Sequence, residues 1–197
     1  MNLPEVSLPE GGHRLLLHCC CAPCSGAIVE CLLANGIRPL IFFSNSNIYS
    51  EEEYLKRREE IVRYAATVGL EVVDDDFSHG DWLRNAAAGY EDAPERGERC
   101  LRCFRYRLGR AARYAAENGF DVLATTLASS RWKDLAQVDS AGQRACAQAS
   151  APGHELLWWG RNWRKGGLQE RRGEIIREQN FYNQNYCGCE FSLPVDK

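Results

Sequence analysis

Long apolar runs are missing from this chain, and so is the basic start with a following apolar core that marks a signal sequence. The apolar residues 15–17 form a stretch far too short to span a bilayer. We therefore expect a cytoplasmic protein with no membrane partner. Internal repeats, low-complexity segments and interdomain linkers are also absent, which excludes repeat and multidomain architectures. A single domain is predicted over 14–197, preceded by a loose, flexible tail over 1–13.

Cysteine is the residue that the chain has in excess, with 10 among 197 residues. Eight of them fall into three clusters, which read Cys-Cys-Cys-Ala-Pro-Cys at 19–24, Cys-Leu-Arg-Cys at 100–103 and Cys-Gly-Cys at 187–189. Reducing conditions in the cytoplasm disfavour structural disulfides, so the clusters indicate metal binding or thiol catalysis. Cys31 lies among apolar residues of a predicted helix, and we interpret both Cys31 and Cys146 as structural.

Apolar, strand-like segments alternate with helical ones along the chain. Strands are predicted at 14–18, 38–43, 70–73, 121–126 and 154–159. Helices are predicted at 25–35, 51–68, 81–88, 100–118, 134–149 and 168–179, with a capping-box sequence from Ser50 to Glu53. The alternation predicts an α/β domain with a mostly parallel sheet flanked by helices. Ligands bind such sheets beyond the carboxyl ends of the strands, where the first cysteine cluster falls.

Three chemistries fit clustered thiols on this fold. Cys21 and Cys24, with proline between them after a strand, are also typical of a metal-free, thioredoxin-like thiol oxidoreductase. Two cysteine pairs are typical of structural zinc, which would suit a non-catalytic nucleic-acid-binding module. An iron–sulfur cluster takes four thiolates and would leave a pair for electron delivery. The adjacent Cys20 and Cys21 and the spare pair, Cys187 and Cys189, favour an iron–sulfur reductase with an accessory dithiol.

Cys100 and Cys103 lie three residues apart near the start of a predicted helix, so they share one face of it. The positive end of the helix and the neighbouring Arg99 and Arg102 are expected to favour thiolate over thiol. Thiolate is the form that binds metal, so this pair is a candidate for metal ligation.

Charge is unevenly divided along the chain. The first 93 residues carry 7 Lys or Arg and 15 Asp or Glu. The remaining residues carry 17 Lys or Arg and 12 Asp or Glu. Basic residues mix with tryptophans in the second part, which is typical of phosphate contacts and base stacking. We expect a nucleic-acid partner, with Trp163 stacking on a base and Arg105, Arg164 and Lys165 meeting phosphates. The alternative is a Trp163 packed in the core, with basic residues that only solvate the surface.

Six segments, spread in order from about Arg14 to Leu193, carry a resemblance to a known family. They read Leu-Leu-Leu-His-Cys-Cys-Cys-Ala-Pro-Cys-Ser at 15–25, Phe-Phe-Ser-Asn-Ser-Asn-Ile at 42–48, Glu-Arg-Gly-Glu-Arg-Cys-Leu-Arg-Cys-Phe at 95–104, Ser-Arg-Trp-Lys-Asp at 130–134, Asn-Trp-Arg-Lys-Gly-Gly at 162–167 and Tyr-Cys-Gly-Cys-Glu-Phe-Ser at 186–192. Together they resemble the epoxyqueuosine reductases of the QueH type. The resemblance implies reduction of epoxyqueuosine to queuosine at the wobble position of tRNA, the last step of queuosine biosynthesis. It also implies a [4Fe-4S] cluster, no cobalamin, and a sheet related to the adenine-nucleotide α-hydrolase-like (PP-loop) fold.

The resemblance also implies roles for the clustered cysteines. Cys187 and Cys189 match the redox-active pair, and the cluster ligands match Cys20, Cys21, Cys100 and Cys103. Cys24 matches a position that can be Asp in the family. It is therefore expected either to hold an additional mononuclear iron or to lie next to the substrate. Cys19 looks like an extra cysteine.

The implied reaction needs more than these thiols. An epoxide becomes an alkene by taking up two electrons and two protons and releasing water, so a proton donor and an electron donor are required. His18, Lys133 and Asp134 are proton-donor candidates only by their closeness to the motifs. The electron donor is not identified by the sequence. ATP is not expected, because the cysteine run at 19–24 occupies the place of the Gly-rich phosphate loop of related folds.

Overall fold

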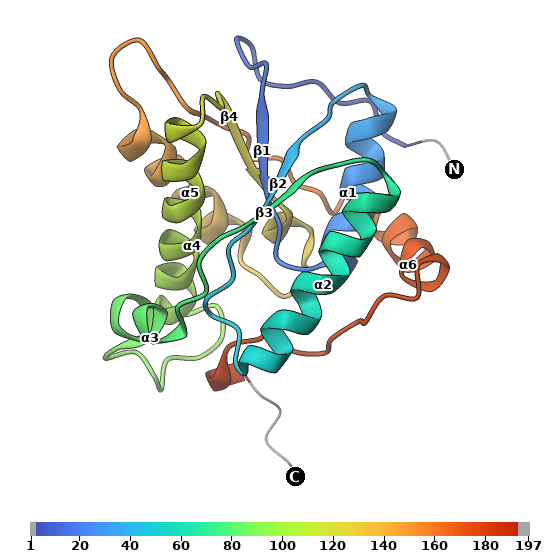
Figure 1. The fold of residues 1–197 in the computed structure, drawn as a ribbon. Coiled ribbons are helices and arrows are strands. Elements are labelled where there is room, and N and C mark those ends of the chain that lie inside the picture. The colour runs from blue at the N-terminus through green and yellow to red at the C-terminus, as the bar shows by residue number, and fades with distance from the viewer. Residues whose placement is uncertain (1–2, 193–197) are drawn as a thin grey trace.

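The computed structural model describes residues 3–192 and shows a parallel sheet between two layers of helices (Figure 1). The strands are β1 (Leu15–His18), β2 (Leu40–Phe43), β3 (Val72–Asp74), β4 (Val122–Thr125) and β5 (Leu157–Trp158). Their order is β3-β2-β1-β4-β5, and all neighbouring pairs are parallel. The predicted α/β class with a mostly parallel sheet is confirmed. The relation to the PP-loop fold stays a prediction.

The helices divide between the two faces of the sheet (Figure 1). One face is covered by α1 (Ala22–Ala34), α2 (Glu51–Thr67) and α6 (Leu168–Glu178), and the other by α4 (Glu98–Glu117) and α5 (Leu135–Ala149). Short elements connect them: α3 (His79–Trp82), the π-helical turn η1 (Leu83–Ala87) and the 3₁₀ turns η2 (Thr126–Ser129) and η3 (Glu190–Ser192). Among residues 3–192, no helix combines the length and the apolarity needed to cross a membrane.

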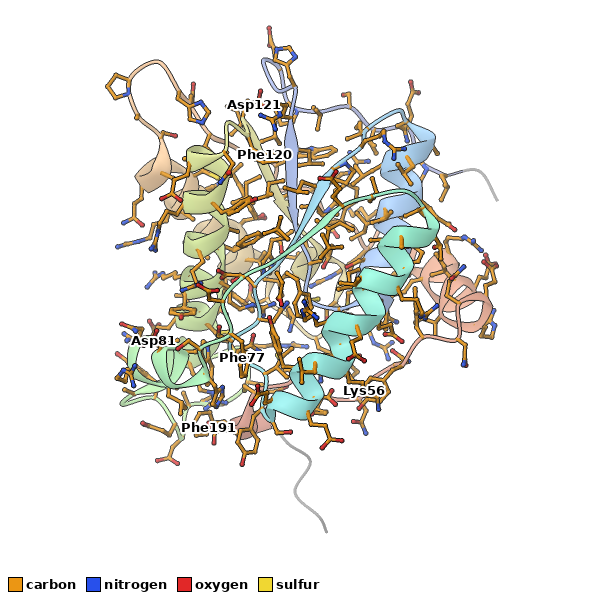
Figure 2. The ribbon with its side chains drawn as sticks, in the orientation of Figure 1. Lys56, Phe77, Asp81, Phe120, Asp121 and Phe191 are labelled. Carbon is orange, nitrogen blue, oxygen red and sulfur yellow. The ribbon has the colours of Figure 1, made fainter. Side chains whose placement is uncertain are left out.

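Two apolar cores lie on the two faces of the sheet. Successive strand side chains point to opposite faces, so Leu17 joins the core under α1 and α2 while Leu16 joins the core under α4 and α5. Phe43 and Phe42 divide in the same way. Because both faces are covered, the strands read in the sequence as continuous apolar runs. Figure 2 shows side chains filling both layers, with Asp121 at the amino-terminal edge of the sheet and Phe191 beyond the opposite edge.

The chain reverses its direction of travel across the sheet between β1 and β4. From β1 it moves through β2 to β3 on one side, and later through β4 to β5 on the other. β1 and β4 pair in register from Leu15 with Val122 to His18 with Thr125, so both strands end at the same level. In open parallel sheets the crevice beyond such a switch point is the usual ligand site. Cys19 and Thr126 are the first residues past these two ends.

Several local details differ from the sequence predictions. α1 begins at Ala22 instead of 25, since Pro23 fits the first turn of a helix, where no N–H is needed for the helical ladder. Ser50 does precede α2, but its hydroxyl makes no capping hydrogen bond. Within the N-terminal segment, Val6 is buried and its N–H donates to Asn35 Oδ1 at 3.1 Å, so this part of the segment packs against α1.

Candidate active site

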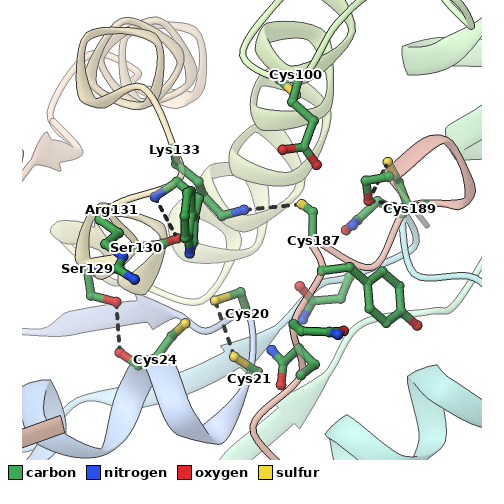
Figure 3. Close-up of a pocket in the computed structure, with 18 of the residues that line it drawn as sticks. Cys20, Cys21, Cys24, Cys100, Ser129, Ser130, Arg131, Lys133, Cys187 and Cys189 are labelled. Carbon is green, nitrogen blue, oxygen red and sulfur yellow. Dashed lines mark hydrogen bonds between the residues drawn. The ribbon is translucent and has the colours of Figure 1, made fainter. Parts of the chain in front are cut away.

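A cavity of about 920 Å³ opens at the switch point, beyond the carboxyl ends of β1 and β4. Cysteines from all three sequence clusters line it (Figure 3), and they are Cys20, Cys21, Cys24, Cys100, Cys187 and Cys189. The clusters lie far apart in the sequence, and the fold brings them to one hollow. Cys19, Cys31, Cys103 and Cys146 are buried and are not part of its wall.

Three of these sulfurs form a tight group at the start of α1. The Sγ atoms of Cys20, Cys21 and Cys24 all lie within 4.8 Å of one another, and the Cys20–Cys21 separation is 3.8 Å. The turn η2 after β4 fixes this group, because Thr126 Oγ1 accepts from the Cys20 N–H at 3.2 Å and the Ser129 hydroxyl donates to the Cys24 carbonyl at 3.1 Å. The cluster of thiols is therefore held by both strands of the switch point.

Charge in this group concentrates on one sulfur. Hydrogen bonds from the Cys21 and Cys24 thiols hold the pKa of Cys20 well below its usual range, and Lys133 and Arg107 act in the same direction. The same hydrogen bonding raises the pKa of Cys21 and, to about 11, that of Cys24. Cys20 is thus the most acidic sulfur of the group and its neighbours are the donors. A soft sulfur that loses its proton readily, next to two further thiols, has the donor chemistry to bind a thiophilic metal.

The second cluster divides between two environments. Cys100, on the first turn of α4, lines the cavity, whereas Cys103 lies in a separate apolar cluster with Trp82 and Cys189. Burial raises the pKa of both thiols, that of Cys103 to about 12. The charge of Arg99 acts in the predicted direction and lowers the pKa of Cys100, but burial outweighs it. The guanidinium groups of Arg99 and Arg102 donate to backbone carbonyls in the segment 85–93.

The thiol of Cys187 lies next to a positively charged lysine. The Lys133 ammonium donates to Cys187 Sγ at 3.2 Å (Figure 3). Burial would raise the pKa of Cys187, but the charges of Lys133 and Arg107 outweigh it and lower the pKa. Cys187 is therefore the more acidic sulfur of its pair, because burial raises the pKa of Cys189, whose thiol donates to Ser192 Oγ at 3.4 Å. Both are free thiols.

The backbone of the third cluster is held by α2. Arg57 Nη1 donates to the carbonyl of Cys187 at 3.2 Å. This approach depends on Gly188, whose φ is +112° and at which a Cβ atom would lie 2.9 Å from Arg57 Nη1. Glycine is needed here both for the backbone conformation and for the space.

Arg107 and Asn45 belong to the site although sequence reasoning did not single them out. Arg107 is 2% exposed, its Nε donates to Ser44 O at 3.2 Å, and its Nη2 donates to Asn45 Oδ1. Asn45 Nδ2 in turn donates to the carbonyl of Cys19 at 2.9 Å. A buried cation thus positions the cysteine run through a single amide. The only available signal was the Ser-Asn-Ser-Asn sequence after β2, which marks Asn45 but not Arg107.

Two of the three proton-donor candidates have structural roles. His18 is fully buried and does not line the cavity. Burial lowers its pKa to about 3, so the ring is neutral, donating from Nε2 to Ser44 O at 3.2 Å and accepting at Nδ1 from the Thr125 hydroxyl at 2.7 Å. Asp134 is the N-cap of α5 and accepts from the N–H of Ala136 at 2.8 Å. Asp134 also lines the cavity, but because its carboxylate is engaged in this cap, Lys133 remains as the proton-donor candidate there.

The residues expected to meet nucleic acid lie in different surroundings. Trp163 is 1% exposed and sits in the core, so neither face of its ring is open to a base and the structure assigns it to packing. Arg164 donates to the carbonyls of Ser130 and, at 2.7 Å, of Lys133. Arg105 and Lys165 are exposed, away from the cavity wall.

Taken together, the fold and the cavity define a thiol-dependent α/β oxidoreductase with donors suited to a metal. Comparison with known proteins identifies the family. Residues 15–194 match the family described as epoxyqueuosine reductase QueH, and the chain belongs to this family.

The similarity to individual relatives covers most of each relative's length as well. A protein of Histophilus somni named epoxyqueuosine reductase QueH is 46% identical over 190 residues, which are 96% of this chain and 76% of that protein. A protein of Acinetobacter baylyi with the same name is 44% identical, over 98% of this chain and 87% of that protein. The similarity extends to Thermotoga maritima, whose protein of this name is 32% identical over 91% of this chain and 90% of its own length.

Proposed function

We propose that this protein reduces epoxyqueuosine to queuosine at the wobble position of tRNA. The observation that carries the proposal is the cavity, in which the three cysteine clusters of a QueH family member face one another. A thioredoxin-like enzyme would need only Cys21 and Cys24, and it would leave Cys20, Cys100 and Cys187 in the same cavity without a role. A zinc module without catalysis would have no use for an acidified thiol beside a lysine. A tRNA substrate implies action in the cytoplasm.

The donor set fits a metal centre built from thiolates. We propose that Cys20, Cys21, Cys100 and Cys103 hold a [4Fe-4S] cluster and that Cys24 holds an additional mononuclear iron or contacts the substrate. The 3.8 Å separation of Cys20 and Cys21 and the position of Cys100 on the same cavity wall support this set. Cys24, and not Cys103, completes the closely spaced group here, so the fourth ligand needs a direct test. When bound, such a centre supplies single electrons and a Lewis acid.

The dithiol supplies the reducing equivalents in this proposal. Loss of the epoxide oxygen takes two electrons and two protons, and the oxygen leaves as water. Oxidation of the Cys187 thiolate and the Cys189 thiol to a disulfide releases two electrons and one proton, and the Lys133 ammonium supplies the second proton, so the reaction balances. Lys133 keeps Cys187 in the thiolate form and is placed to hold a proton at its Nζ atom inside the cavity. An external electron donor then returns the disulfide to the dithiol. Neither ATP nor cobalamin takes part.

Iron and activity measurements test the assignment. In protein purified without oxygen, Cys20→Ala, Cys21→Ala and Cys100→Ala should each lower bound iron and sulfide and abolish turnover. Comparing Cys103→Ala with Cys24→Ala decides which of the two is the fourth ligand. Cys146→Ala is the matched control, because it removes a buried thiol outside the cavity. Full iron content and turnover in Cys100→Ala would refute the ligand set, and zinc in place of iron would refute the reductase.

A second experiment separates the dithiol from the metal ligands. Replacing Cys187 and Cys189 together with Ser should leave the iron–sulfur absorbance intact and stop multiple turnover. Loss of the absorbance in this double variant would show that the two residues are ligands and that the proposed division is wrong.

A further inference from the structure

The turn 130–133, which links η2 to α5, is fixed by two arginines from distant segments. Arg164, ahead of α6, donates to the carbonyls of its first and last residues, Ser130 and Lys133. Arg96, ahead of α4, donates to the two middle carbonyls, at 3.3 Å to Arg131 and at 2.9 Å to Trp132. All four carbonyls of the turn therefore accept from guanidinium groups. Such a turn presents its side chains in a set position.

Trp132 projects from this turn at the cavity. It lines the cavity wall and is 64% exposed, the highest value among the exposed large apolar residues in the described part of the chain. The Arg131 guanidinium lies 4.9 Å from the centre of the Trp132 ring. An exposed aromatic ring on a rigid support loses little conformational freedom on binding and gains from being covered. The feature is that of a binding platform rather than a packing residue.

The charge of the cavity indicates which kind of partner covers this ring. Seven arginine and lysine side chains line it, against three carboxylates. Most of the cations are engaged with protein groups, but among residues 3–192 no carboxylate oxygen lies within 4.0 Å of the Arg131 guanidinium nitrogens. A flat ring beside an unneutralised guanidinium, in a positive hollow, suits a partner with both flat rings and phosphates. Single-stranded nucleic acid has both.

We infer that Trp132 stacks on a base of the tRNA anticodon loop next to the modified base, and that Arg131 meets the adjoining phosphate. The inference rests on the proposed function, because the modified base must enter the cavity of about 920 Å³ for its epoxide to reach Cys187. With that base turned out of the loop, its neighbour loses a stacking partner, and the indole at the mouth of the cavity replaces it. Trp132 thereby takes the role that the sequence pattern suggested for Trp163.

Binding of an anticodon stem-loop containing epoxyqueuosine, followed by fluorescence anisotropy at several salt concentrations, tests the inference. Trp132→Ala should weaken binding roughly 5- to 150-fold with an unchanged salt slope, because stacking involves no counterion. Trp132→Phe should retain most of the affinity, whereas Trp132→Leu, which keeps bulk without an aromatic face, should resemble Trp132→Ala. Arg131→Ala should reduce the salt slope by about 0.7. Leu55→Ala, at an exposed position of α2 outside the cavity, is the control and should bind as the wild type does.

Turnover measurements separate this inference from the proposed function. Trp132→Ala should raise KM with little change in kcat, since the platform is not among the reacting groups. Wild-type turnover together with unchanged affinity in Trp132→Ala overturns the role of Trp132 alone. Absence of reduction by the wild type, with its metal centre intact, overturns the proposed function and this inference with it. Equal losses in Trp132→Phe and Trp132→Ala would show that the ring does not act by stacking.

Discussion

Replacing Lys133 with methionine is the most direct test of how the cavity activates its thiols. The Lys133 ammonium lies 3.2 Å from Cys187 Sγ. Two unit charges at this distance attract by about 5 kcal/mol at an effective dielectric constant of 20. Both groups are only partly buried, so solvent weakens this attraction. We therefore take the contribution of the Lys133–Cys187 contact as about 1.5–3 kcal/mol, the range for hydrogen bonds to charged groups in proteins. One pKa unit corresponds to about 1.4 kcal/mol, so Lys133→Met should raise the pKa of Cys187 by about one to two units.

The pH dependence of alkylation measures this shift. Only the thiolate reacts, so the rate at Cys187, followed by mass spectrometry of its peptide, falls as the pH drops through the pKa. In Lys133→Met the midpoint should move to higher pH, while Lys133→Arg, which keeps the charge, should move it less. Lys56→Met is the control, because Lys56 lies over the ring of Tyr182, away from the cavity wall. An unchanged midpoint in Lys133→Met would refute the role of Lys133.

Three glycine substitutions test the packing of the fold. Gly188→Ala should lower the free energy of unfolding by about 1–3 kcal/mol and reduce turnover, since its Cβ would meet Arg57 Nη1 at 2.9 Å; wild-type stability in urea would contradict this. Gly142→Ala should lower the free energy of unfolding by a similar amount, because a Cβ there would lie 2.3 Å from the Trp158 ring and force α5 away from β5. Gly109→Ala, in α4, where an added methyl group would meet no atom within 4 Å, should instead stabilise by about 0.5–1 kcal/mol in the same urea titration. A loss of stability in Gly109→Ala would show that the space around Gly109 does not accommodate a methyl group.

The strands and helices could be predicted from the sequence, because short stretches of residues determine where each of them begins and ends. Continuous apolar runs predicted the buried parallel strands, and the glycines after three helices predicted where those helices end. β5 was predicted as six residues and is two residues long, Leu157–Trp158. The apolar pattern there is not specific to a strand, since Trp158 also packs against Gly142 of α5.

The site was predictable only in part, because its side-chain directions depend on contacts between distant segments. The sequences Arg131-Trp132-Lys133 and Trp163-Arg164-Lys165 have the same composition, yet Trp132 is 64% exposed and Trp163 1%. Nothing within either tripeptide determines which ring lies in the core and which lies at the cavity. In the same way, the pairing of Lys133 with Cys187 joins residues 54 positions apart, which no local pattern could indicate.

The start of α1 has a consequence for the reduction potential of any metal that its cysteines hold. Cys21 is the N-cap residue and its side chain makes no capping hydrogen bond, and Cys20 and Cys24 lie at the same amino-terminal end of the helix. The helix dipole places partial positive charge there, which favours the more negative, reduced state of a metal–thiolate centre. A stabilisation of about 1 kcal/mol corresponds to roughly 40 mV for one electron. The thirteen residues of α1 would thus shift the midpoint potential upward, toward easier electron uptake.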